Sequence, residues 1–289
     1  MNRVALTLVF ALLGCSDPPP PPEPVPTPTP KPAPVTDWLD EHPREGDIGA
    51  AAAVETKHYR VVSNLSAAFV ERYAQRLERL HAVLRLRLGA WPTDTKRPQV
   101  WIYATAEGYA DEAMVPGSLA FYSFRDRRLV LKHGRYSEQT SLDGLADQLA
   151  SLYLHQLVGE RIHQLGWLAA GVGSYLSAFR EEHGAFVLGA PRDSLRERLA
   201  GREAKLLPLI EEPWTPEARA DAWSLVHCLF EHSEPALRQR GQRWLEKLLV
   251  FDGPSAPADQ VAALGAERDQ RELERDWAKW RERLAKSPR

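Results

Sequence analysis

The stretch LVLKHGRYSEQTSLDGLADQLASLYLHQL, residues 129–157, decides the predicted fold because the spacing of its apolar residues changes along it. Residues 129–132 read as one arm of a β-hairpin. Further along, the apolar residues recur with helical spacing, at Leu142, Leu145, Leu149, Leu152 and Leu157. Strands therefore give way to helices within this segment.

Upstream of this stretch the sequence predicts further strands. HYRVVS at residues 58–63 and QVWIYA at residues 99–104 are rich in the β-branched and aromatic residues that strands favour. Residues 120–124 form the other arm of the hairpin, with the charged turn RDRR at residues 125–128 between the arms. The N-terminal part of the domain therefore contains a sheet.

A long helix is predicted between the first two strands. Ser66 stands at its start as an N-cap, and Gly89 ends it as a left-handed cap. Its apolar stripe consists of Phe69, Tyr73, Leu77, Leu80, Leu84 and Leu88. One face of this helix is therefore expected to pack against the sheet.

The rest of the chain reads as helical. A helix over residues 142–163 is followed by another from Trp167 to Phe179. Later stripes comprise Trp223, Val226 and Phe230, then Leu237, Trp244, Leu245 and Leu248, and finally Leu273, Trp277, Trp280 and Leu284. Strands first and helices later indicate an α+β fold, with a mixed N-terminal sheet and long helices followed by an all-helical C-terminal part.

The N-terminus reads as an export signal. One positive charge at Arg3 precedes an apolar run over residues 4–13, which is too short to span a bilayer. Leu12-Leu13-Gly14-Cys15 resembles the lipobox of bacterial lipoproteins. The resemblance implies removal of residues 1–14, acylation of Cys15 and attachment to a membrane through lipid. A secretory signal with an incidental cysteine is the alternative.

Ser16 follows this cysteine, where lipoproteins retained in an inner membrane often carry aspartate. The expected location is therefore the cell envelope, at the outer membrane rather than the inner one. Residues 15–35 hold the lipidated cysteine and the run PPPPPEPVPTPTPKPAP, which predicts an extended polyproline II spacer. Two further segments are expected, an α+β domain over 36–180 and a helical subdomain over 181–289.

Composition limits the class of protein. Apolar residues make up 44% of the chain and charged residues 26%, as in globular proteins. The formal net charge of −2, with both signs interspersed, gives no reason to expect a nucleic-acid partner. Cys228 is the only other cysteine, so a chain acylated at Cys15 has no intramolecular disulfide.

Several segments together resemble one family, the peptidase MA-like (gluzincin) type of zinc metallopeptidase found behind bacterial signal peptides. The resemblance runs from about Val54 to Leu284 and implies a zincin-like fold for the N-terminal sheet and its helices. The segments that carry it are HYRVVS, LRLRLG, VWIYA, FYSFRDRRLVL, the helix over residues 142–163, WLAAGVGSYL and AWSLVHCLF.

In that family, His-Glu-x-x-His supplies two zinc ligands and the general base, and a glutamate in Trp-Leu-x-Glu-Gly supplies the third ligand. Aligned on this pattern, Ser151 replaces the first histidine and Leu152 the base. Ala170 replaces the third ligand, and only His155 is retained. If the His-Glu-x-x-His motif is instead started at His155, the general base and the second histidine are missing. The resemblance therefore implies a pseudoenzyme with no zinc and no other cofactor.

Other residues do not restore a site by sequence spacing. On a straight helix, Glu160 and His163 are turned away from His155. Asp147, Ser151 and His155 share one helix stripe, but a catalytic triad needs the histidine between the other two. Whether His183, His227 and His232 come together is left open by the sequence.

The leading hypothesis is a lipid-anchored envelope protein whose inactive peptidase-like domain binds a peptide or an envelope protein. Candidate cleft residues are His155, Trp167 and Tyr175. We expect His155→Ala to leave stability nearly unchanged if that residue is a relic. The alternatives are an active zinc peptidase with divergent ligands and a purely structural envelope lipoprotein.

Overall fold

A computed structural model describes most of the chain after residue 51. The described residues are 52–91, 97–105, 109, 118–133, 138–178, 180–182, 185–187, 193–199, 203–212, 215–250 and 252–286. They belong to one compact unit, Trp38–Arg289. The expected signal peptide, Cys15, the proline-rich linker and His183 lie outside the described residues.

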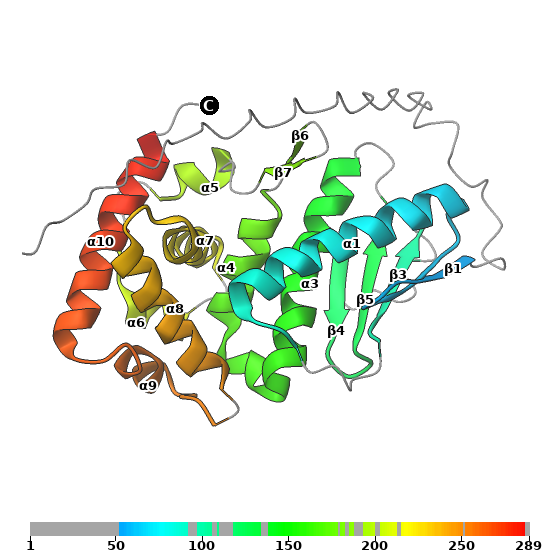
Figure 1. Ribbon diagram of the computed structural model, residues 1–289. Coiled ribbons are helices and arrows are strands. Elements are labelled where there is room, and N and C mark those ends of the chain that lie inside the picture. Colours follow the sequence, from blue (N-terminus) through cyan, green and yellow to red (C-terminus); the bar gives the residue numbers. More distant parts are fainter. Residues whose placement is uncertain are drawn as a thin grey trace, which may run out of the picture. The chain divides into compact units, whose positions relative to one another are not determined.

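A five-stranded mixed sheet forms the N-terminal part (Figure 1). Its strands are β1 (Ala52–Glu55), β2 (Arg60–Ser63), β3 (Gln99–Tyr103), β4 (Ala120–Ser123) and β5 (Arg128–Lys132), in the order β1-β2-β3-β5-β4. Strands β2, β3 and β5 run parallel, with Val61 opposite Val100 and Val100 opposite Leu129. Strands β1 and β4 pair antiparallel at the two edges. Because Val61, Val100 and Leu129 are fully buried, this row belongs to the core.

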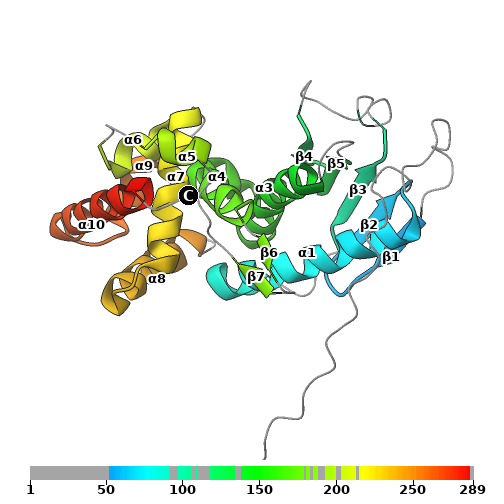
Figure 2. The same cartoon turned by 90° about the horizontal axis from the view of Figure 1, so that it is seen from above.

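Two long helices cover one face of the sheet. Helix α1 (Ala67–Leu88) contacts β1 and β2, and α3 (Glu138–Val158) contacts β4 and β5. The two helices also contact each other, as the two views show (Figures 1 and 2). The predicted stripe of α1 is buried throughout, from Phe69 to Leu88. The sheet and these helices therefore share one core.

The later part is built around α7 (Pro216–Glu231), which contacts α4, α5, α6, α8 and α10 (Figure 2). Thr215 caps α7, because its Oγ1 accepts a hydrogen bond from the backbone N–H of Ala218 at 3.0 Å. The other helices are α4 (Gly166–Leu176), α5 (Asp193–Glu197), α6 (Leu206–Glu211), α8 (Pro235–Leu249), α9 (Pro257–Ala262) and α10 (Glu267–Lys286). Among the described residues, no helix is both long and apolar enough to cross a membrane.

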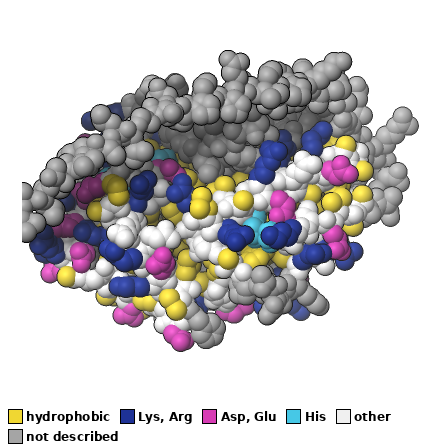
Figure 3. Space-filling view, in the orientation of Figure 1, with side chains coloured by type: hydrophobic (Ala, Val, Ile, Leu, Met, Phe, Trp, Pro, Cys, Tyr) yellow, Lys and Arg dark blue, Asp and Glu magenta, His cyan; other side chains and the backbone are white. Residues whose placement is uncertain are grey.

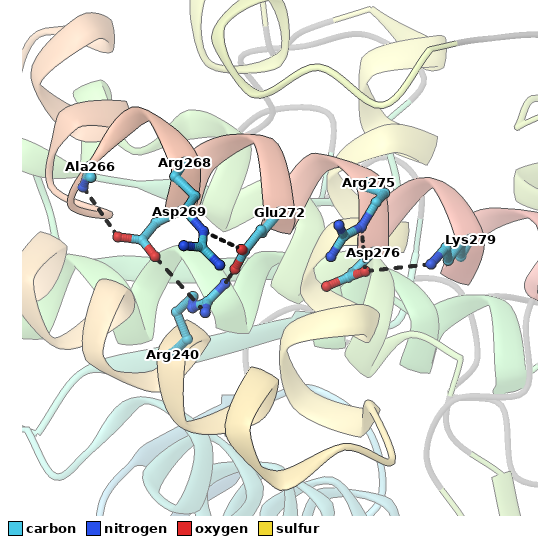
Figure 4. A network of polar contacts seen from close by, with 8 residues as sticks. All are labelled: Arg240, Ala266, Arg268, Asp269, Glu272, Arg275, Asp276 and Lys279. Carbon is cyan, nitrogen blue, oxygen red and sulfur yellow. Dashed lines mark hydrogen bonds and ion pairs between the residues drawn. The ribbon is translucent and has the colours of Figure 1, made fainter.

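Polar contacts tie the last helix to α8 (Figure 4). Nη1 of Arg240 on α8 donates to Glu272 on α10 at 2.9 Å, and Arg268 Nε donates to the other oxygen of Glu272 at 2.8 Å. Asp269 lies 3.9 Å from Arg240 and accepts a hydrogen bond from the backbone N–H of Ala266 at 3.2 Å. The same carboxylates therefore hold the start of α10 and link it to α8 through Arg240.

The α+β class is confirmed, and the elements differ from the expectation in four places. Strand β1 was not predicted, since only Val54 among its residues is β-branched. A hairpin of β6 (Arg180–Glu182) and β7 (Ala185–Val187) interrupts the part expected to be all helical. Strands of three residues are too short for an alternating pattern to show.

The other two differences concern helix ends. Gly89 has a positive φ of 92° but a ψ of 170°, so it ends α1 in an extended rather than a left-handed helical conformation. The helix predicted over residues 142–163 stops at Val158, and a 3-10 helix, η1 (Gly159–Gln164), follows. Gly159 has a φ of +59°, which favours glycine and turns the chain at this point.

Candidate functional site

A cavity of about 420 Å³ lies beside α3, α4 and the start of α7. It contains Ser151 and Ala170, two of the positions that the metallopeptidase resemblance places in the active site. The described residues that line it are Phe124, Asp147, Gln148, Ser151, Ala169, Ala170, Thr215, Pro216 and Arg219. This cavity is therefore the candidate functional site.

Helix geometry explains the α3 side of the cavity. Asp147, Gln148 and Ser151 are spaced i, i+1 and i+4, so they lie on one side of α3. Gly173 on α4 lets the two helices approach, because a Cβ there would collide with the backbone and carboxylate of Asp147. The sequence thus positions an acidic, an amide and a hydroxyl side chain against α4.

An ion pair occupies the polar side of the cavity. Nη2 of Arg219 on α7 donates to Oδ1 of Asp147, and Nε of the same guanidinium donates to Ser174 Oγ at 3.0 Å. Gln148 Nε2 donates to Oδ2 of Asp147 at 3.1 Å. The Asp147 side chain is only 19% exposed, so its charge is neutralised at short range by the Arg219 cation.

These side chains limit the chemistry of the cavity. A catalytic zinc site needs three protein ligands, and the described lining residues offer one carboxylate, which is already paired with a cation. The amide of Gln148 has no basic lone pair with which to take a proton from water. Within the ranges that the structure describes, no three His, Cys, Asp or Glu side chains form a group able to hold a metal ion.

His155 is not among the described residues that line this cavity and is 4% exposed. Its Nδ1 is 2.7 Å from the hydroxyl of Tyr122 on β4, and its Nε2 is 3.5 Å from Glu160. Burial lowers the pKa of His155, although the Glu160 carboxylate partly opposes this. Leu152 is fully buried in the core. Of the four positions in the sequence-based alignment, Ser151 and Ala170 therefore line the cavity, whereas Leu152 and His155 do not.

The other two candidate cleft residues are packed in the helical part. Trp167 is fully buried, stacks on Trp244 with ring centroids 5.3 Å apart, and donates from Nε1 to Gln260 at 3.1 Å. Tyr175 is also buried, and its hydroxyl donates to Glu231. Burial and the Glu231 carboxylate raise the pKa of Tyr175. Neither residue lines the cavity with Ser151, so the three candidates do not form one cleft there.

The structure corrects the expected separation of His155, Glu160 and His163. Nε2 of His163 is 3.6 Å from Glu160, so this carboxylate approaches both imidazoles. The expectation assumed a straight helix, whereas the chain turns into η1 at Gly159. His227 and His232 both pack on Trp280, with ring centroids 5.6 Å and 5.0 Å away.

Sequence reasoning missed the role of Arg219. It follows Asp147 by 72 residues, in a helix whose apolar stripe explained the segment without it. No local pattern marks such a pairing. Neither a protein-family model nor a curated protein matches the chain, so the site rests on its own geometry.

Proposed function

We propose that this chain is a lipid-anchored protein of the bacterial envelope whose domain is a non-catalytic relative of zinc metallopeptidases and binds a peptide or an envelope protein. The observation that carries the proposal is the Arg219–Asp147 ion pair in the cavity. A guanidinium beside the one carboxylate among the described lining residues repels a divalent cation and occupies an oxygen that would bind it. Zinc is therefore not expected.

The cavity also favours a different position for the relic motif, one helical turn earlier than the sequence alone suggested. We place it at residues 147–151. Asp147 and Ser151 then stand where the two histidines would be, Gln148 replaces the general base, and Ala170 replaces the third ligand. All four residues line the same cavity. None of the four is the residue that the metallopeptidase motif has at its place, so the domain is proposed as a pseudoenzyme.

Metal content tests this proposal. The full chain, purified in detergent without chelators or a histidine tag, should contain less than about a tenth of an equivalent of zinc by plasma mass spectrometry. About one equivalent would contradict the proposal and support the alternative of an active peptidase with divergent ligands.

Two designed variants test the position of the motif. Asp147→His, Ser151→His and Ala170→Glu, combined with Arg219→Gln, should create a zinc site of about one equivalent, because all these positions share the cavity. The matched control is Ser151→His, Leu152→Glu and Ala170→Glu with His155 kept. It should gain no zinc, because Leu152 and His155 are buried and do not line the cavity. Zinc in the control alone would restore the original alignment.

Binding is separated from a purely structural role by crosslinking in cells. A photoreactive residue at Ser151 should give a specific adduct with a peptide or protein, because Ser151 lines an open cavity. The same group at Arg238, an exposed position on α8, is the control. Absence of an adduct specific to position 151 would favour the structural alternative.

The anchor is tested separately. The Cys15→Ser variant should lose acylation and remain in the aqueous phase when detergent is separated from water, since each buried CH2 of an acyl chain contributes about 0.8 kcal/mol to membrane binding. Partitioning of the variant into detergent would refute the anchor and leave the assignment of the cavity untouched.

A further inference from the structure

A second cavity, also of about 420 Å³, has strongly basic walls. It lies at the end of α1, beside the turn between β1 and β2 and the residues before β3, and shares no lining residue with the cavity at Asp147. Its polar and aromatic lining consists of Lys57, His58, His81, Arg85, Trp91 and Arg97. Figure 3 shows a surface patch of histidine with Lys and Arg side chains on both sides and an acidic side chain next to it.

The two histidines of this cavity are held in place. Their rings stack with centroids 3.7 Å apart and planes inclined by 12°. His58 Nδ1 lies 2.6 Å from Glu78, whose other oxygen accepts the backbone N–H of His58 at 2.8 Å. His81 Nδ1 lies 2.9 Å from the hydroxyl of the buried Tyr59. In each ring, Nδ1 is hydrogen-bonded to another side chain, and Nε2 has no hydrogen-bond partner among the described residues.

The cations of this cavity are not all neutralised. Arg97 pairs with Glu55 at 2.6 Å, whereas Lys57 and Arg85 make no ion pair with any described residue. None of the described residues that line the cavity is acidic. Burial lowers the pKa of His81 to about 4, and the charges of His58, Arg85 and Lys57 contribute to this lowering while Glu78 opposes it. Positive charge therefore acts on the interior of the cavity.

We propose that this cavity binds a phosphate group carried by a small molecule or by a lipid headgroup. Several cationic donors converge on one space, as required for an anion that bears several acceptor oxygens. The volume exceeds that of a bare phosphate and falls in the range of small-molecule sites. Trp91 packs edge-on against His81, with ring centroids 4.5 Å apart. Its indole gives the cavity an apolar wall for the carbon atoms next to the phosphate.

Calorimetry on the full chain in nonionic detergent at low salt tests this inference. We expect glycerol 3-phosphate to bind more tightly than inorganic phosphate, because only the former reaches the Trp91 wall. Acetate serves as the carboxylate comparison. Affinity equal to that for acetate, or no heat with either phosphate compound, would overturn the proposal. The lipid is tested with mixed micelles that contain phosphatidylglycerol. If the protein binds only these micelles, the natural ligand is a lipid headgroup. If it binds only glycerol 3-phosphate, the natural ligand is a soluble phosphate compound.

Charge variants give the matched control. Arg85→Gln and Lys57→Gln should each weaken glycerol 3-phosphate binding about tenfold, the usual size of one charge-assisted hydrogen bond. Both side chains are exposed, so the fold should tolerate the changes. Arg238→Gln removes the same charge from the exposed surface of α8 and should leave affinity unchanged. An equal loss of affinity in all three variants would show that binding depends only on the net charge of the protein, and would refute a defined site.

Discussion

The hydroxyl of Tyr122 lies 2.7 Å from Nδ1 of His155 and joins strand β4 to helix α3 inside the core. The single histidine that the sequence alignment retained is therefore a structural residue. Both side chains are buried, at 6% and 4% exposure. This contact changes what is expected of His155 when it is replaced.

His155→Ala should lower the free energy of unfolding by about 2 kcal/mol or more, because it leaves the Tyr122 hydroxyl buried without a partner and opens space in the core. The sequence alone led us to expect almost no change. Tyr122→Phe, which removes only the hydroxyl, should cost about 1 kcal/mol. Urea unfolding of the full chain measures both. A loss for His155→Ala no larger than that for Tyr122→Phe would contradict the packed role of the imidazole.

The pairing of Asp147 with Arg219 should appear as a coupling between two mutations. Arg219→Met leaves a mostly buried carboxylate without its cation, whereas Asp147→Asn in the same background removes that charge. We expect a coupling energy of about 1 kcal/mol in a double-mutant cycle, since the arginine side chain is 43% exposed. Additive effects of the two substitutions would show that the ion pair contributes nothing to stability.

Stability should fall as the solution is acidified from about pH 6.5 towards pH 4. Burial lowers the pKa values of His81, His155 and His232, in the case of His81 to about 4. A lowered pKa means that the unfolded chain binds protons first, so stability is complete above the unfolded pKa and is lost below it. For His81 the full shift corresponds to about 3 kcal/mol.

Two variants identify the source of this pH dependence. His81→Gln removes a group whose pKa is shifted, so its stability should vary less between pH 7 and pH 4 than that of the unchanged chain. His163→Gln is the control, because the His163 side chain is 58% exposed. Unfolding midpoints in urea at a series of pH values provide the measurement. Identical slopes for the two variants would argue against His81 as a source.

Gly171 should not tolerate a larger residue, because α7 packs closely against α4 at this position. A Cβ at this position would lie 2.6 Å from the carbonyl oxygen of Ala222 and 2.7 Å from Val226 Cγ2. Gly171→Ala is expected to cost about 2 kcal/mol through overpacking. Gly144→Ala on α3 is the matched control. Its Cβ would meet nothing closer than 3.4 Å, and alanine favours the helix by roughly 0.5–1 kcal/mol. Thermal unfolding of both variants provides the comparison.

Local patterns in the sequence were sufficient for much of the fold. The stripe from Phe69 to Leu88 predicted α1, and the strands at β2, β3 and the β4–β5 hairpin followed from β-branched and aromatic runs. The lipid anchor expected at Cys15 likewise rests on a local motif, which lies outside the described residues. These features depend on neighbours a few residues apart, so a single sequence contains the whole signal.

Only the tertiary structure decided which side chains share a cavity. Ser151 and Ala170 line one cavity with Asp147, Gln148 and Arg219, whereas Leu152 and His155 are buried and do not line it. Asp147 pairs with Arg219, which follows it by 72 residues in the sequence, and His155 contacts the hydroxyl of Tyr122 on the sheet. Contacts between elements depend on how whole faces pack, which no local period encodes. The sequence by itself predicted the long helices, strands β2 to β5 and the expected anchor, and tertiary packing determined which residues line the candidate site.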